Sequence, residues 1–214
     1  MDGSGRPPRD LPADQIITAW LPRVFESAAE RPPAGGPTVR LTLSGSDGGE
    51  WDLCATEESL VVTARDPRAR RSPEENDPDI WLRQSVPDFL ALFHDDPDLP
   101  ALLPGDAGVM DLLYVDERRA SLLAQIDGRL RFEIEGRRRR RWAIDVAFGP
   151  LGMRAGQPRS TVRLDSRTCE ELANGGVAPL QALLAGRLKV EGDRALVMQV
   201  VMLVGSIRRD SLRN

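Results

Sequence analysis

The chain has 214 residues, a net charge of −4 and 41% hydrophobic residues, which allows one large domain or two small ones. No apolar run approaches the roughly 18 residues that a membrane-spanning helix needs, and the polar first residues lack the apolar stretch of a secretory signal. We therefore expect a cytoplasmic protein without a transmembrane segment. Lys189 is the only lysine among many arginines, which is typical of a bacterial, G+C-rich coding sequence.

Few residues are available for catalysis or metal binding. Cys54 and Cys169 lie far apart, so neither a disulfide framework nor a structural zinc site is expected. His94 is the only histidine, and its acidic, proline-containing surroundings indicate a solvated residue at a helix end. The chain has no phosphate-binding loop, dinucleotide-binding fingerprint or nucleophile elbow. We predict no metal, no cofactor and no catalytic residues, and lean against an enzyme.

An apolar helical stripe opens the chain. Between Pro12 and Ala29 the apolar residues fall on one face of a helix, and Pro22 is expected to break that helix into two. A Pro- and Gly-rich linker follows and ends at Pro37. We assign residues 1–37 to this N-terminal helical segment and linker.

Two later parts of the chain resemble each other. Residues 38–45 and 129–136 both alternate apolar and polar residues, as half-buried strands do, and a tryptophan follows each, Trp51 or Trp142. Further blocks match in the same order, and the offset changes only in apparent loops, where insertions cost little free energy. We interpret this as a duplication and predict two superposable α+β units in which the two tryptophans are equivalent. Their bounds are 38–127 and 128–207, before a tail at 208–214.

Helix-capping signals place further elements. In the first unit Ser85 is expected to cap a helix at Phe89–Phe93, and Asp116 to cap another that Gly128 ends. In the second unit Ser166 is expected to cap a helix over Thr168–Ala173 that Asn174-Gly175-Gly176 ends, and Asp193 to cap an apolar helix from Arg194 to Val204. The second unit's strands are expected at about 130–135, 142–148, 161–164 and 187–191, with one more near Met153.

The basic run Arg137–Arg141 stands between two of these strands. It contains no interleaved aromatic residue, and five consecutive arginines cannot be buried unpaired. We interpret it as an exposed hairpin turn and expect no nucleic-acid partner. The alternative is a contact with an anionic headgroup or nucleic acid.

The second unit resembles the sterol carrier protein type 2 family. The shared pattern is a hairpin with a tryptophan on its second strand, a strand ending in serine before a helix, and a strand-Gly-Asp-helix ending. In this sequence the three parts of the pattern are found at Trp142–Val146, Val162–Ser166 and Leu183–Met198. The first unit matches more loosely, with Asp116-Glu117 in place of Gly-Asp. The resemblance implies an α+β fold with one twisted sheet covered by helices. Together with the repeat, it predicts two tandem units, each a twisted, mostly antiparallel sheet covered by helices.

The resemblance also implies an apolar cavity between sheet and helices that binds a lipid or another apolar small molecule. Each buried methylene contributes about 0.8 kcal/mol, so such binding needs no catalytic group. Strand alternation and helix periodicity assign the walls of this cavity. They are Trp142, Ile144, Val146, Phe148, Leu180, Leu183, Leu184, Leu188, Met198 and Met202.

A carrier or sequestering protein is the leading hypothesis. One alternative is an enzyme acting on an apolar substrate in the same cavity, with Asp145 and Glu133 as acid/base candidates, although alternation places both in water. The other is an interaction or assembly module without a ligand. The sequence leaves the ligand, the number of binding units and the oligomeric state open.

Overall fold

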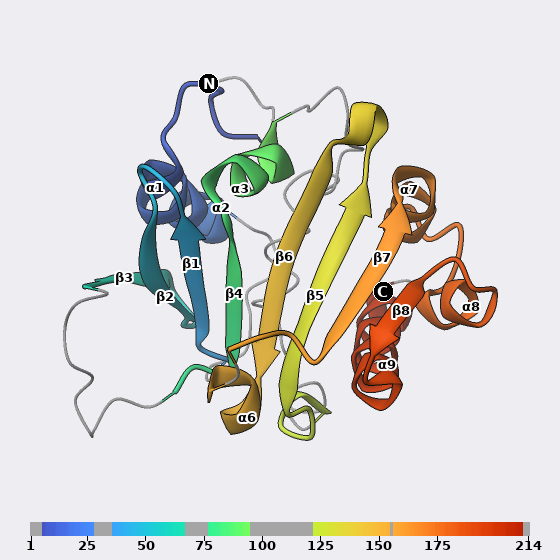
Figure 1. The fold of residues 1–214 in the computed structure, drawn as a ribbon. Helices are drawn as coiled ribbons and strands as arrows, with labels where there is room; N and C mark the ends of the chain where they lie inside the picture. The colour runs from blue at the N-terminus through green and yellow to red at the C-terminus, as the bar shows by residue number, and fades with distance from the viewer. Residues whose placement is uncertain (1–5, 28–35, 67–76, 95–121, 155, 212–214) are drawn as a thin grey trace.

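The computed structural model describes residues 6–27, 36–66, 77–94, 122–154 and 156–211. Within these ranges eight strands form one sheet in the order β3-β2-β1-β4-β6-β5-β7-β8 (Figure 1). The strands are β1 (Val39–Ser44), β2 (Gly49–Ala55), β3 (Leu60–Arg65), β4 (Ile80–Ser85), β5 (Gly128–Glu135), β6 (Arg141–Phe148), β7 (Ser160–Asp165) and β8 (Lys189–Gly192). The helices are α1 (Ala13–Gln15), α2 (Leu21–Ser27), α3 (Val86–Phe93), α6 (Gly149–Arg154), α7 (Ser166–Ala173), α8 (Pro179–Leu184) and α9 (Arg194–Ser211), with a π-helical turn at Ile16–Trp20 and a 3-10 turn at Arg137–Arg139.

One strand arrangement occurs in both halves of the sheet. β1 pairs antiparallel with β2 and parallel with β4, and β5 pairs antiparallel with β6 and parallel with β7. β4 and β7 each run directly into a capped helix, α3 or α7. β4 also pairs antiparallel with β6. The α+β class and the mostly antiparallel pairing are confirmed, but the two halves share one continuous sheet where the sequence predicted two tandem units.

The two tryptophans are not equivalent in register. Trp51 lies opposite Leu41, whereas Trp142 lies opposite Ile134. When the halves are aligned on the helices after β4 and β7, Leu41 corresponds to Phe132, so the tryptophans are two residues out of step. The prediction of equivalent positions is therefore wrong. The turn between β5 and β6, which contains the arginine run, is longer by two residues than the turn between β1 and β2 when the two are compared between the corresponding pairs Ile134–Trp142 and Leu43–Gly49. Each residue that follows this turn is therefore displaced by two positions.

Helix starts follow the capping signals closely. Ser85 accepts a hydrogen bond from the Asp88 backbone N–H (3.2 Å) and caps α3 as predicted, although the helix already begins at Val86, before the predicted Phe89. α7 begins at Ser166 and not at the predicted Thr168, because its cap is Asp165 and not Ser166: the Asp165 side chain accepts the backbone N–H of Thr168 (2.7 Å). Asp193 caps α9 as expected through the N–H groups of Ala195 and Leu196.

The strand expected near Met153 is a helix, α6. Its first turn is capped from a distance: Asp127 Oδ1 accepts the backbone N–H of Leu151 (2.7 Å) and of Gly152 (3.3 Å). Gly128 begins β5 and does not end a helix as predicted. The helix start expected at Asp116 lies outside the described residues.

The N-terminal helical segment packs its apolar stripe against the sheet. Ile16, Ile17, Leu21 and Phe25 are buried in the main core, together with apolar residues of the strands and of α9. The chain passes through the π-helical turn just before Pro22, which lacks an N–H to donate, so the helix is interrupted there. In Figure 1, α1, α2 and α9 lie behind the strands. They cover one face of the sheet, which we call the apolar face.

The arginine run forms the predicted hairpin turn. The Gly136 N–H donates to the Arg140 carbonyl (2.8 Å) across the 3-10 turn between β5 and β6. Arg137, Arg138 and Arg141 are exposed, while Arg140 forms an ion pair with Asp88 at 2.8 Å. The absence of a nucleic-acid role stays a prediction. In the part of the chain that the structure describes, no helix is long and apolar enough to cross a membrane.

Candidate functional site

The four β6 residues of the predicted cavity lie on the apolar face, as alternation required. Trp142 is buried in a small cluster with Ile134 of β5, and Ile144 packs against that cluster. The Trp142 indole Nε1–H donates to the Asp88 carbonyl of α3 (2.7 Å), which ties the second half of the sheet to a helix of the first. Val146 and Phe148 belong to the main core. These four residues therefore contribute to two separate clusters.

The six predicted residues beyond β6 divide between core and surface. Leu188 is buried, and Leu180 and Leu183 pack partly buried against the main core. By contrast, the side chains on the outer side of α8 and α9 reach solvent, with 75% exposure at Leu184, 37% at Met198 and 54% at Met202. Neither of the two described pockets is lined by any of the ten predicted residues.

Leu184 of α8 and Met198 and Met202 of α9 are exposed apolar side chains, and we call these three residues the α8–α9 patch. The two helices contact each other, and Met198 and Met202 lie one turn apart on the same side of α9. The opposite side of α9 carries Leu196 and Val200, which are buried. The patch is thus apolar surface directly above the core of the second half. Methionine side chains are flexible enough to adapt to irregular apolar ligands.

The acid/base candidates lie on the opposite face of the sheet, as alternation indicated, but in ion pairs and not in free water. Glu133 accepts hydrogen bonds from Arg163 (2.8 Å) and Arg131 (3.0 Å). The bond from Arg163 is the main cause of its lowered pKa. Asp145 is contacted by Arg131 at 3.4 Å. A general acid needs a raised pKa near the working pH, so Glu133 does not suit that role.

The remaining chemically interesting residues are structural. Cys54 and Cys169 are not joined by a disulfide, and Cys169 packs against the Trp142 cluster. His94 stands at the C-terminal end of α3, as predicted, but is half-buried where solvation was expected.

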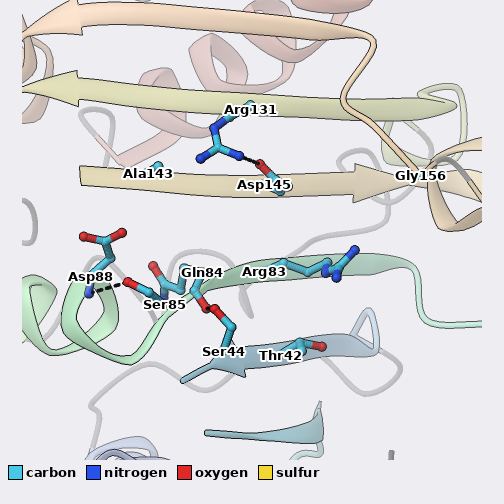
Figure 2. A pocket seen from close by; sticks show the side chains of 10 residues that line it. All are labelled: Thr42, Ser44, Arg83, Gln84, Ser85, Asp88, Arg131, Ala143, Asp145 and Gly156. Atoms are coloured by element: carbon cyan, nitrogen blue, oxygen red, sulfur yellow. Dashed lines mark hydrogen bonds and ion pairs between the residues drawn. The ribbon is translucent and has the colours of Figure 1, made fainter. Parts of the chain in front are cut away.

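Sequence reasoning missed a polar pocket on the face of the sheet opposite the apolar face, which we call the polar face. The pocket has a volume of about 320 Å³ and opens where β1, β4 and β6 lie side by side (Figure 2). Its lining is Thr42, Ser44, Arg83, Gln84, Ser85, Asp88, Arg131, Ala143, Asp145 and Gly156. The available signal was the alternation on β1, where the polar residues Arg40, Thr42 and Ser44 repeat at every second position.

The fold thus belongs to the α+β class, with one mixed sheet covered on its apolar face by helices. The sequence pattern of the SCP-2 sterol transfer family matches residues 109–205. The resemblance of the second half to sterol carrier proteins is therefore confirmed, whereas residues 38–108 of the first unit lie outside the match. No curated protein matches the chain.

Three solved structures are similar over part of the chain. Sterol carrier protein 2 from Yarrowia lipolytica is 16% identical with a TM-score of 0.30, over 41% of this chain and 74% of that one. The sterol carrier protein domain 2 of Helicoverpa armigera is 18% identical with a TM-score of 0.31, over 40% and 72%. Sterol carrier protein 2 like 2 from Aedes aegypti is 20% identical with a TM-score of 0.28, over 44% and 98%. The function proposed below does not rest on these likenesses.

Proposed function

We propose that this protein binds and carries a lipid or another apolar small molecule, and that the binding unit is its second half, residues 128–207. The observation that carries the proposal is the match of residues 109–205 to a sterol transfer family. Burial of an acyl chain or sterol supplies binding free energy without catalytic groups. The arginine-rich composition fits a bacterial, cytoplasmic carrier.

We place the entrance for the ligand at the α8–α9 patch. Its apolar side chains are exposed, and on α8 itself Leu180 and Leu183 pack partly buried against the core. Movement of α8 away from α9 would join the patch to the apolar face of β5 and β7, which α9 contacts. In this arrangement Met198 and Met202 contact the ligand from α9, and Leu184 contacts it from α8.

We also propose that the two halves arose by duplication, although only the second retained binding. Both halves repeat the strand order, the parallel third strand and the capped helix that follows it. Both hairpins also carry a cross-strand arginine–aspartate pair at the corresponding place on the polar face, Arg40–Asp52 and Arg131–Asp145.

The test is binding of a fluorescent fatty-acid probe to the purified protein, together with mass spectrometry of an organic extract. The double variant Met198→Glu, Met202→Glu introduces charge on the α8–α9 patch without disturbing buried residues. We expect it to weaken probe binding about tenfold or more, because charged groups are costly against an apolar ligand. Gln199→Glu is the control, since Gln199 is exposed on the same helix, and it should bind as the wild type does. Absence of both probe binding and co-purified lipid would contradict the carrier function.

A further inference from the structure

Two arginines at the centre of the polar face contact no carboxylate among the described residues. The guanidinium carbon of Arg83 lies 5.0 Å from the centre of the Trp81 ring, and that of Arg129 lies 5.4 Å from the same ring. Two cations therefore share one indole. Cation–π contact is favourable for each of them, but it does not neutralise either charge.

The arginines on both sides of this centre are paired. Toward β2, Arg40 and Arg65 donate to Asp52. Toward β7, Arg131 and Arg163 donate to Glu133. Among the described arginines named here, the uncompensated positive charge therefore lies at the middle of the face, where β4 meets β6.

The positive charge of Arg129 is unfavourable without a carboxylate partner, because Arg129 is only 1% exposed. Its Nε atom is buried without a hydrogen-bond partner, and its Nη1 reaches the Gly156 carbonyl at 3.4 Å. Burial and the charge of Arg83 lower the pKa of Arg129, and Asp145 offsets this only in part. A buried guanidinium with an unused donor is expected to have a compensating acceptor.

The polar pocket lies beside these two arginines. Arg83 and Gly156 line it directly, and Figure 2 shows the hydroxyls of Ser44 and Ser85 on the neighbouring strands. Its two carboxylates already have cationic partners, Asp145 with Arg131 and Asp88 with Arg140. A volume of about 320 Å³ is at the lower end of small-molecule sites, and the polar lining is unsuited to an apolar ligand.

We propose that this pocket binds the carboxylate or phosphate group of a small anionic molecule, with Arg83 and Arg129 as its counter-charges. The planar guanidinium groups match the geometry of both oxyanions, and both lie within 5.4 Å of the centre of the Trp81 ring. This site lies on the opposite face of the sheet from the proposed apolar site, so either can exist without the other.

The test follows the indole N–H resonance of Trp81 by NMR. This N–H donates to Thr42 Oγ1 in the pocket wall (2.8 Å), and Trp81→Phe assigns its signal. Titration with inorganic phosphate or with succinate should shift the resonance in a saturable way. Arg83→Gln should weaken that binding about tenfold, the effect of losing a charged hydrogen-bond donor. Arg83→Lys keeps the charge but not the planar guanidinium group, so its affinity should lie between those of the wild type and Arg83→Gln.

Arg194→Gln is the matched control, because Arg194 is exposed at the start of α9, and it should bind like the wild type. Vesicles of phosphatidylcholine with and without phosphatidylserine identify the source of the anion. A response only to phosphatidylserine, lost in Arg83→Gln, supports the site with a lipid headgroup as its ligand. No response to phosphate, succinate or either vesicle would overturn the proposal. Undiminished binding in a folded Arg83→Gln variant would overturn it as well.

Discussion

Arg40 is buried within the sheet although arginine is rarely buried completely. Its Nε and Nη2 donate to the two carboxylate oxygens of Asp52 (2.7 and 3.0 Å), the facing residue on β2. Arg65 donates to the same carboxylate from β3 (2.7 Å). The three strands at this edge of the sheet are therefore connected by one carboxylate. Removal of one partner from such a pair leaves the other charge buried and uncompensated.

This arrangement predicts a pH dependence of stability. Burial alone would raise the pKa of Asp52, but the hydrogen bonds and charges of Arg40 and Arg65 outweigh it and lower the pKa. A carboxyl with a lowered folded-state pKa stabilises the protein above its unfolded pKa of about 3.9, and this stability is lost as the pH falls through the folded value. We expect Asp52→Asn to lower the free energy of unfolding at neutral pH by roughly 3 kcal/mol, and to reduce the loss of stability with falling pH below about pH 4.

Urea unfolding across this pH range measures both effects. Glu58→Gln, at an exposed position in the turn between β2 and β3, is the control and should keep the wild-type slope. An Asp52→Asn variant with unchanged stability at neutral pH would show that the ion pair contributes little.

Residue-level periodicity predicted which face each strand residue occupies, but not how deeply it is buried. Glu133 and Asp145 lie opposite the apolar face, as alternation required. Their solvation was predicted wrongly, because ion pairs with arginines on neighbouring strands are not visible in one strand's pattern. Arg129 is covered in part by Gly156, which follows α6. Such coverage depends on how a loop crosses the sheet.

At the scale of elements, the junction of β8 and α9 corresponds to the most specific signal in the sequence, Gly192-Asp193. Gly192 has a φ of +95°, which side-chain-bearing residues rarely adopt. A Cβ at this position would lie 2.2 Å from the Arg159 carbonyl oxygen. Asp193 caps α9, and its carbonyl accepts the Ser160 hydroxyl (2.7 Å), which holds the helix start against β7.

We therefore predict that Gly192→Ala lowers the free energy of unfolding by more than the roughly 1–2 kcal/mol of left-handed backbone strain alone. The additional loss comes from the collision of the new Cβ with the Arg159 carbonyl oxygen. Neither β7 nor β8 can move to relieve it without breaking their pairing. Gly175→Ala is the matched control: Gly175 also has a positive φ (+72°), but open space surrounds its Cβ position. Chemical denaturation of both variants gives the comparison. Equal losses would show that the close approach in β8 is not a constraint.

The elements that sequence reasoning predicted well are those set by neighbours in the chain. The caps at Ser85 and Asp193 depend on residues two or three positions away. The strand predicted near Met153 failed because Asp127, far back in the chain, caps α6. For the candidate site, the apolar face of β6 was predicted correctly. The exposure of Met198 and Met202 was not, since α9 is apolar nearly all round and its sequence does not indicate which side meets the sheet.

At the scale of the whole molecule, the pairing of β4 with β6 determines how the halves depend on each other. The similar sequence blocks suggested two independent units. The alternation of β4 and of β6 does not indicate that these two strands pair with each other. In the structure Leu82 faces Val146 and Ile80 faces Phe148 across this boundary. The Trp142 indole also donates to the Asp88 carbonyl across it. The core is correspondingly continuous from the N-terminal helices to α9.

Separation of the halves into fragments 1–121 and 122–214 tests this dependence. Alone, the second fragment would expose the β6 edge with unpaired backbone groups and apolar side chains, which favours edge-to-edge association. We expect it to dimerise or aggregate and to lose the near-ultraviolet circular dichroism of packed Trp142. Mixing the fragments should restore that signal, and the intact chain should unfold in one cooperative transition. Size-exclusion chromatography and calorimetry check these outcomes. A monomeric second fragment that unfolds cooperatively, together with two transitions in the intact chain, would mean that the β4–β6 pairing joins two domains that are each stable alone.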